Sequence, residues 1–147
     1  MKKTNFVTLS VAIASLLFIS CSKDPENPPC TTSSAAIAGS YKVTAATYKA
    51  SSTAAEMDYM NILYYDACER DDVITFNSNG TYQYTDAGVV CSPSGNDVGT
   101  WALAGTTSMT IDGDAVTLES FDCRKLIIVN NDTQLPGDKL KLTLTKQ

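Results

Sequence analysis

Alternating apolar and polar residues dominate the chain from about position 40 onward. In the clearest stretch, Leu140, Leu142 and Leu144 share one face, while two lysines and a threonine occupy the other. This is the two-residue period of a β-strand with one buried face. The same alternation, rich in Val, Ile, Thr and Tyr and interrupted by Gly, Asn and Asp, predicts eight strands, at 40–50, 72–76, 81–86, 98–104, 108–112, 115–121, 124–130 and 139–145.

The connections between these strands are mostly short. Turns such as "NSNG" and "DGD" have too few residues for a crossover, so neighbours in sequence should pair as antiparallel neighbours in space. Closing the meander removes its exposed edges. We therefore predict an all-β fold, an eight-stranded antiparallel up-and-down barrel. The alternative is an immunoglobulin-like sandwich, but that fold places a tryptophan between two cysteines, whereas Trp101 follows both Cys68 and Cys91.

One long segment, 51–70, departs from the alternation. Met57, Met60 and Tyr64 recur in it at a spacing that places them on one side of a helix. We expect a loop that contains a helical turn or a short helix.

The N-terminus has the pattern of a secretory signal peptide. Lys2 and Lys3 precede an uncharged, largely apolar run at 6–19, which is followed by Ser20 and Cys21. The run is shorter than the roughly 20 residues of a membrane-spanning helix. A buried N-terminal helix is the alternative. The predicted organisation is a signal peptide at 1–20, a flexible tether rich in Pro, Ser and Thr at 21–36, and a barrel domain at 37–147.

The end of the apolar run, Phe18-Ile19-Ser20-Cys21, resembles the lipobox of bacterial lipoproteins. The resemblance implies cleavage before Cys21 and acylation of that cysteine with several fatty acid chains such as palmitate, which together make a durable anchor. The following "SKDPE" resembles the export signals of Bacteroidetes lipoproteins. We expect an outer-membrane lipoprotein, on the periplasmic side or at the cell surface, whose bilayer contact is covalent.

Charge and composition exclude several classes of function. The net charge is −5, and loss of the two leader lysines would lower it to about −7, which argues against nucleic acid and against electrostatic docking on anionic lipid. The absence of histidine excludes serine-histidine triads, cysteine-histidine pairs and histidine-ligated metals. We predict a protein that is not an enzyme and needs no cofactor or metal.

The strand order sorts the cysteines. With Cys21 acylated, four cysteines remain, which allow three pairings. Cys30 and Cys123 fall at one end of the meander and Cys68 and Cys91 at the other, and a disulfide needs Cα atoms within about 7 Å. We predict Cys68–Cys91 and Cys30–Cys123, with free buried thiols as the alternative. The long loops 51–70, 87–97 and 131–137 should lie beside Cys68 and Cys91, away from the anchor.

Three stretches resemble the lipocalin-like domains of secreted Bacteroidetes lipoproteins. They are "IAGSYKVTA" at 37–45, with Tyr41 where lipocalins have tryptophan, "CERDDVITFNSNGTYQY" at 68–84 with the following Cys91, and "GTWAL" at 99–103. The resemblance extends from Ile37 to the C-terminus. It implies a small eight-stranded barrel with an internal cavity, which in lipocalins holds a small lipophilic molecule.

Candidate ligand residues are aromatic and aliphatic side chains expected inside the barrel or over its mouth. The alternative is a barrel filled by its own side chains. The acidic clusters "ERDD", "DGD" and "NND" suggest either calcium or ordinary turns, and none has the spacing of an EF-hand. A pair of glycosidase carboxylates would need a cleft for which the chain offers little room. The candidates are Ile74, Phe76, Tyr82, Tyr84, Trp101 and Leu103 as lining, with Tyr59 and Tyr64 as lid residues.

Two functions remain open from the sequence. The first is a membrane-anchored lipoprotein whose barrel binds a small apolar or amphipathic ligand. The second is a non-catalytic surface module with a filled barrel, whose loops contact a protein or a glycan.

Overall fold

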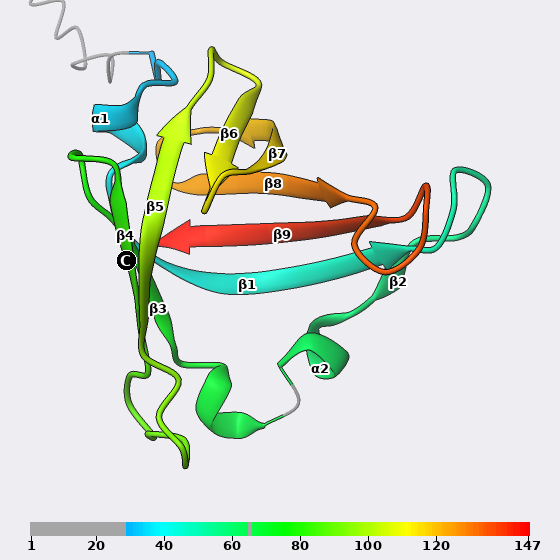
Figure 1. Cartoon of the computed structure of the whole chain (residues 1–147), viewed down its shortest axis with the longest axis horizontal. Helices are drawn as coiled ribbons and strands as arrows, with labels where there is room; N and C mark the ends of the chain where they lie inside the picture. Colours follow the sequence, from blue (N-terminus) through cyan, green and yellow to red (C-terminus); the bar gives the residue numbers. More distant parts are fainter. Residues whose placement is uncertain (1–28, 65) are drawn as a thin grey trace, which may run out of the picture.

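A computed structural model describes residues 29–64 and 66–147. The predicted signal peptide and the predicted lipidation site Cys21 lie outside the described residues. The elements, which Figure 1 traces by colour along the chain, are α1 (Ser34–Ile37), β1 (Gly39–Lys49), β2 (Met57–Asp58), α2 (Met60–Leu63), η1 (Ala67–Glu69), β3 (Val73–Phe76), β4 (Thr81–Thr85), β5 (Asp97–Leu103), β6 (Ser108–Ile111), β7 (Asp114–Phe121), β8 (Lys125–Asn131) and β9 (Lys139–Lys146).

The strands form one closed antiparallel sheet. Consecutive strands pair from β3 to β9, β3 pairs with β1, and β9 returns to pair with β1 from Tyr41↔Lys146 to Lys49↔Lys139. The predicted up-and-down barrel is therefore confirmed, and each predicted strand boundary lies within one residue of the observed one. A single closed sheet excludes the immunoglobulin-like sandwich. The unpredicted strand β2 adds two residues that pair with the end of β1.

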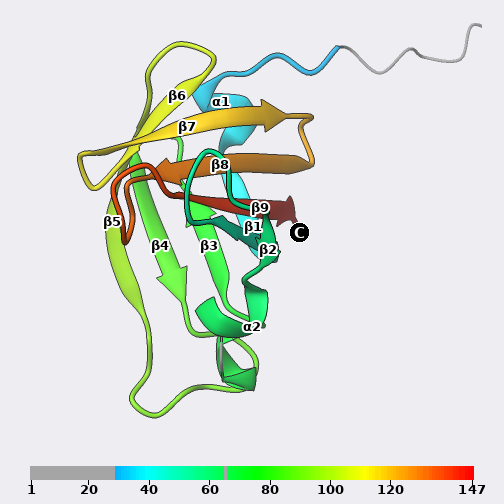
Figure 2. The same ribbon diagram turned by 90° about the vertical axis from the view of Figure 1, so that its right-hand side faces the viewer.

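The pairing between β1 and β3 covers only part of β1, and we call the unpaired stretch between these two strands the seam. The edge of β1 that faces β3 pairs with it only at residues 39–41, and pairs with β2 at residues 47–48. Between these points β3 diverges, so that in Figure 1 β1, β8 and β9 run across the view while β3, β4 and β5 run down it. The helix α2 lies in the angle between the two groups, and Figure 2 shows it beside the lower end of β3.

The seam explains the structure of the segment at 51–70. Met60 and Tyr64 pack against the core through this gap. Met57 instead lies on β2, with 53% of its surface exposed. The predicted short helix is present as α2, but the expected grouping of Met57 with Met60 and Tyr64 on one helical face is wrong, because pairing with β1 holds Met57 in an extended strand.

An aromatic cluster fills the end of the barrel next to α1, which we call the closed end. The ring of Phe76 lies edge-on to Tyr41 and to Trp101, with centroids 5.8 and 5.3 Å away. The Tyr41 hydroxyl donates a 2.6 Å hydrogen bond to the carbonyl of Ile37, a fully buried residue of α1. Trp101 Nε1 donates to the carbonyl of Asn77 at 2.9 Å, so both polar groups of the cluster are satisfied.

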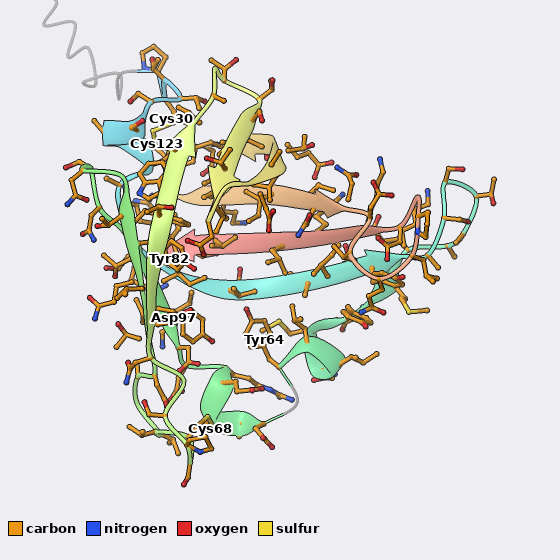
Figure 3. All side chains as sticks on the ribbon, in the orientation of Figure 1. Cys30, Tyr64, Cys68, Tyr82, Asp97 and Cys123 are labelled. Carbon is orange, nitrogen blue, oxygen red and sulfur yellow. A yellow bond between two sulfur atoms is a disulfide. The ribbon has the colours of Figure 1, made fainter. Side chains whose placement is uncertain are left out.

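Both predicted disulfides are present. Cys30 and Cys123 join the chain before α1 to the β7–β8 turn, with Cα atoms 5.7 Å apart. Cys68 and Cys91 join η1 to the β4–β5 loop at 5.3 Å. Figure 3 shows Cys30 and Cys123 far from Cys68, as the meander requires. Among the described residues, no helix has the length and apolar character needed to cross a bilayer.

Candidate ligand pocket

An open pocket of about 240 Å³ lies inside the barrel, at the end away from α1. In the strand order, loops 50–56, 86–96 and 132–138 and the β6–β7 turn follow the strand ends away from α1, and we call this set of connections the mouth end. The inward faces of β6, β7, β8 and β9 supply the walls, because the register places Ile128 opposite Leu142 and Asn130 opposite Leu140. The lining residues are Ile111, Asp112, Asp114, Val116, Ile128, Asn130, Leu140 and Leu142.

The pocket has an apolar floor and an acidic rim. Val116 and Ile128 are 5% and 6% exposed and belong to the hydrophobic core, and Ile111 and Leu142 pack against that core. Asp112, Asp114 and Asn130 are exposed at the opening. The lining contains two carboxylates and no lysine or arginine. Such a rim favours a ligand head that donates hydrogen bonds or carries positive charge.

Contacts from two strands, β4 and β5, fix the position of Asp112 in the β6–β7 turn. Its Oδ2 accepts a hydrogen bond from the Tyr82 hydroxyl, and its Oδ1 accepts from the backbone N–H of Thr100 at 2.8 Å. Gly99 makes this possible, because a Cβ there would collide with the Asp112 carboxylate and the Tyr82 ring. The hydrogen bonds from Tyr82 and Thr100 lower the pKa of Asp112, so the rim carries a fixed negative charge at neutral pH.

A buried carboxylate orders the loop beside the pocket. Asp138 is fully buried, immediately before β9, and accepts hydrogen bonds from the backbone N–H groups of loop residues 133, 134 and 135. The Tyr48 hydroxyl donates to it as well, at 2.8 Å. Burial by itself raises the pKa of Asp138, but these hydrogen bonds outweigh it and hold the pKa well below its ordinary value.

The predicted lining residues lie inside the barrel but do not border this pocket. Phe76 and Trp101 fill the closed end, and Leu103 packs against the same core. Tyr82 lies next to Phe76 and reaches the pocket only through its hydrogen bond to Asp112. Whether any of these four side chains touches a ligand stays a prediction.

Three other candidates close the seam between β1 and β3. Ile74, Tyr64 and Tyr84 border a narrow space with Val43 and no room for a ligand. The Tyr84 hydroxyl donates to Asp72 at 2.7 Å, and burial with this hydrogen bond raises the pKa of Tyr84 strongly. The remaining candidate, the expected lid residue Tyr59, stacks on Tyr48 at 5.0 Å; its hydroxyl accepts from Gln134 Nε2 at 2.8 Å. Tyr59 therefore braces the mouth loops.

The apolar lining residues of the pocket are aliphatic, whereas most candidates expected from the sequence are aromatic. The signal that would have found the lining was the alternation itself: Val116, Ile128 and Leu142 are the inward positions of three consecutive strands. Within residues 29–64 and 66–147, no group of three carboxylate or cysteine side chains is placed to hold a metal ion.

The family of the chain follows from its sequence as well as its fold. A family model described as a lipocalin-like domain matches residues 37–142, from the end of α1 into β9. The chain belongs to this family. Lipocalin-like domains are generally non-catalytic. Comparison of this lipocalin-like domain with curated proteins and with solved structures gives no significant match.

Proposed function

We propose that this lipocalin-like domain binds a small amphipathic molecule whose apolar part enters the interior pocket and whose donor or cationic head meets Asp112 and Asp114. The observation that carries the proposal is the pocket of about 240 Å³ with an apolar floor and a rim without basic residues. It is smaller than the about 300–1,000 Å³ of pockets for drug-sized ligands, which favours a short chain or a single ring. Each methylene buried on the floor would contribute about 0.8 kcal/mol.

Methyl NMR with three probes of equal chain length tests this proposal. Hexylamine, hexanol and hexanoate would be titrated into protein labelled at isoleucine and valine methyls. We expect saturable shifts at Ile128 and Val116 for hexylamine and hexanol, and weaker binding of hexanoate because the rim is acidic. Filling the pocket with Ile128→Phe should abolish the shifts at Val116. The control is Ile127→Phe on the outward face of the same strand. Absence of saturable shifts with all three probes contradicts the proposal.

We further propose that the domain is a lipoprotein held at the outer membrane through Cys21. The basic N-terminus, the apolar run and the lipobox-like Phe18-Ile19-Ser20-Cys21 support this. The described chain leaves the barrel near Cys30, at the end opposite the mouth, so an anchor there would direct the mouth away from the bilayer. The mass of the N-terminal peptide from the native host tests the anchor: it should start at an acylated Cys21, and a soluble, unacylated protein would overturn it.

A second candidate function is contact with a protein partner through the mouth loops. One observation favours it: the large apolar side chains that are exposed in the described residues lie only on loops 86–96 and 132–138, on the 57–63 segment that carries β2 and α2, and at the start of β5. Such concentration is typical of interaction surfaces. A photo-crosslinker at Val90 in the native host should then form one defined protein adduct that a crosslinker at Lys125 does not form. The exposed residues are Met57, Ile62, Leu63, Val89, Val90, Val98 and Leu135.

A further inference from the structure

A second pocket, of about 280 Å³, lies on the outward face of the sheet that carries the interior pocket. On β9, Lys139 and Lys141 alternate with the inward Leu140 and Leu142, and Lys139 and Lys141 line the outer pocket. The two pockets therefore lie on opposite faces of the same strands. The outer pocket is lined by Thr47, Lys49, Glu56, Thr117, Glu119, Val129, Asn131, Lys139 and Lys141.

The basic residues of this pocket are arranged unusually for an acidic protein. Lys49 on β1 is directly opposite Lys139 on β9. Like charges at directly opposed positions of neighbouring strands repel and destabilise a sheet. Within the described part of the chain, neither lysine has a carboxylate within 4.0 Å, whereas the adjacent Lys141 pairs with Glu119 at 3.2 Å and with Glu56 at 3.9 Å. Both lysines line the pocket without an ion pair in the described residues, although Lys49 is near enough to Glu56 to lower its pKa, so both ammonium groups can contribute to anion binding.

The remaining lining residues can recognise hydroxyl groups. Glu56 accepts a hydrogen bond from the Thr47 hydroxyl and pairs with Lys141, and both lower the pKa of Glu56, with a smaller effect from Lys49. Glu119 lies across the pocket on β7, and both carboxylates accept hydrogen bonds. Asn131, next to Lys139 in the register, can both donate and accept.

The floor of the pocket is apolar. Val129 points outward, yet it is only 8% exposed, because the longer side chains of its neighbours surround it. An apolar patch beneath a ring of hydrogen-bonding groups suits a flat molecule with polar edges. The two glutamates also disfavour a multiply charged anion, since each added negative charge would lie near them.

We propose that the outer pocket binds a sugar acid, a ring with one carboxylate and several hydroxyls. The carboxylate lies between the ammonium groups of Lys49 and Lys139. Ring hydroxyls bond to Glu56, Glu119 and Asn131, and the ring rests on Val129. This site is independent of the interior pocket, because the two are lined by opposite faces of the sheet.

Titration of the ¹⁵N-labelled domain with glucuronate tests the proposal. We expect saturable shifts at the backbone amides of residues 49, 131 and 139, and a Kd about tenfold lower than that of glucose, which lacks the carboxylate. Lys49→Gln and Lys139→Gln should each weaken glucuronate binding about tenfold, the loss expected for one charged hydrogen bond. Because each substitution removes a like-charge pair, neither variant should unfold at a lower temperature than the parent protein.

Two control variants separate this site from the rest of the surface. Lys125 lies at the other end of β8, opposite Thr145. The Lys125→Gln variant should therefore bind glucuronate as tightly as the parent protein. Ile128→Phe, which fills the interior pocket, should also leave glucuronate binding unchanged. Equal binding of glucose and glucuronate, tighter binding of inorganic phosphate, or an equal loss in Lys125→Gln would each overturn the proposal, as would absence of saturation.

Discussion

The hydroxyl of Tyr48 on β1 donates a 2.8 Å hydrogen bond to Asp138, a fully buried carboxylate 90 residues further along the chain. The same carboxylate accepts hydrogen bonds from three backbone N–H groups of the loop before β9. One side chain thus ties the 132–138 loop to the first strand. It does so beside the strands that line the interior pocket, so the shape of the mouth depends on it.

Replacing Asp138 with asparagine should loosen this loop. The amide has one acceptor oxygen instead of two. Its NH₂ group would face backbone N–H groups that now donate hydrogen bonds to the carboxylate. We expect a lower unfolding temperature and faster amide hydrogen exchange at residues 133–135. The matched control is Asp114→Asn, which changes an exposed carboxylate in the same way. Equal exchange rates in the two variants would contradict a role for Asp138.

Acid should destabilise the protein through the same group. The pKa of Asp138 is lower in the folded protein than in the unfolded chain, so its contribution to stability is complete above its ordinary pKa near 3.8. That contribution is lost progressively as the pH falls from about 4 through the depressed folded pKa. The difference in unfolding temperature between the parent protein and Asp138→Asn should therefore be constant between pH 6 and 5 and shrink below about pH 4. A difference that grows on acidification would refute this assignment.

The rim carboxylate can be followed through its tyrosine partner. The hydrogen bond to Asp112, with burial and the nearby negative charge, raises the pKa of Tyr82 to about 12. Asp112→Asn removes the charge and should bring the Tyr82 pKa back toward 10, as measured by the ¹³Cζ shift of labelled tyrosine. Gly99→Ala should do the same, because the added methyl group displaces the ring and the carboxylate from each other. An unchanged Tyr82 pKa in both variants would show that Asp112 does not hold this hydroxyl.

The sequence predicts the barrel well because a two-residue period survives in almost every strand. Leu140, Leu142 and Leu144 lie on the inward face of β9 as that period requires. The disulfides follow from the same strand order, since an up-and-down meander assigns each loop to one end. These features are local, or are fixed by connectivity alone.

The position of the open pocket depends on where β3 separates from β1, and the alternation of apolar and polar residues does not predict that point. Strand β3 leaves β1 after three residues, and Met60 and Tyr64 fill the gap, which closes the side of the barrel that carries Ile74 and Tyr84. The open volume is left on the far side, between β6 and β9. Such divergence is a tertiary property, because it depends on how the segment at 59–64 packs against two strands at once.

The two disulfides should differ in their effect on stability. In the chain-entropy model the stabilisation grows with the enclosed loop, and the sequence separations are 93 residues for Cys30–Cys123 and 23 for Cys68–Cys91. The double serine variants should therefore lose about 4.5 and about 3 kcal/mol of unfolding free energy, respectively, in denaturant titrations of the oxidised proteins. Cys30 lies in the segment before α1, so its substitution releases that segment from the barrel. An unchanged unfolding free energy would show that the Cys30–Cys123 disulfide does not stabilise the closed end. A larger loss for Cys68–Cys91 would instead place the weak point of the fold at the mouth loops.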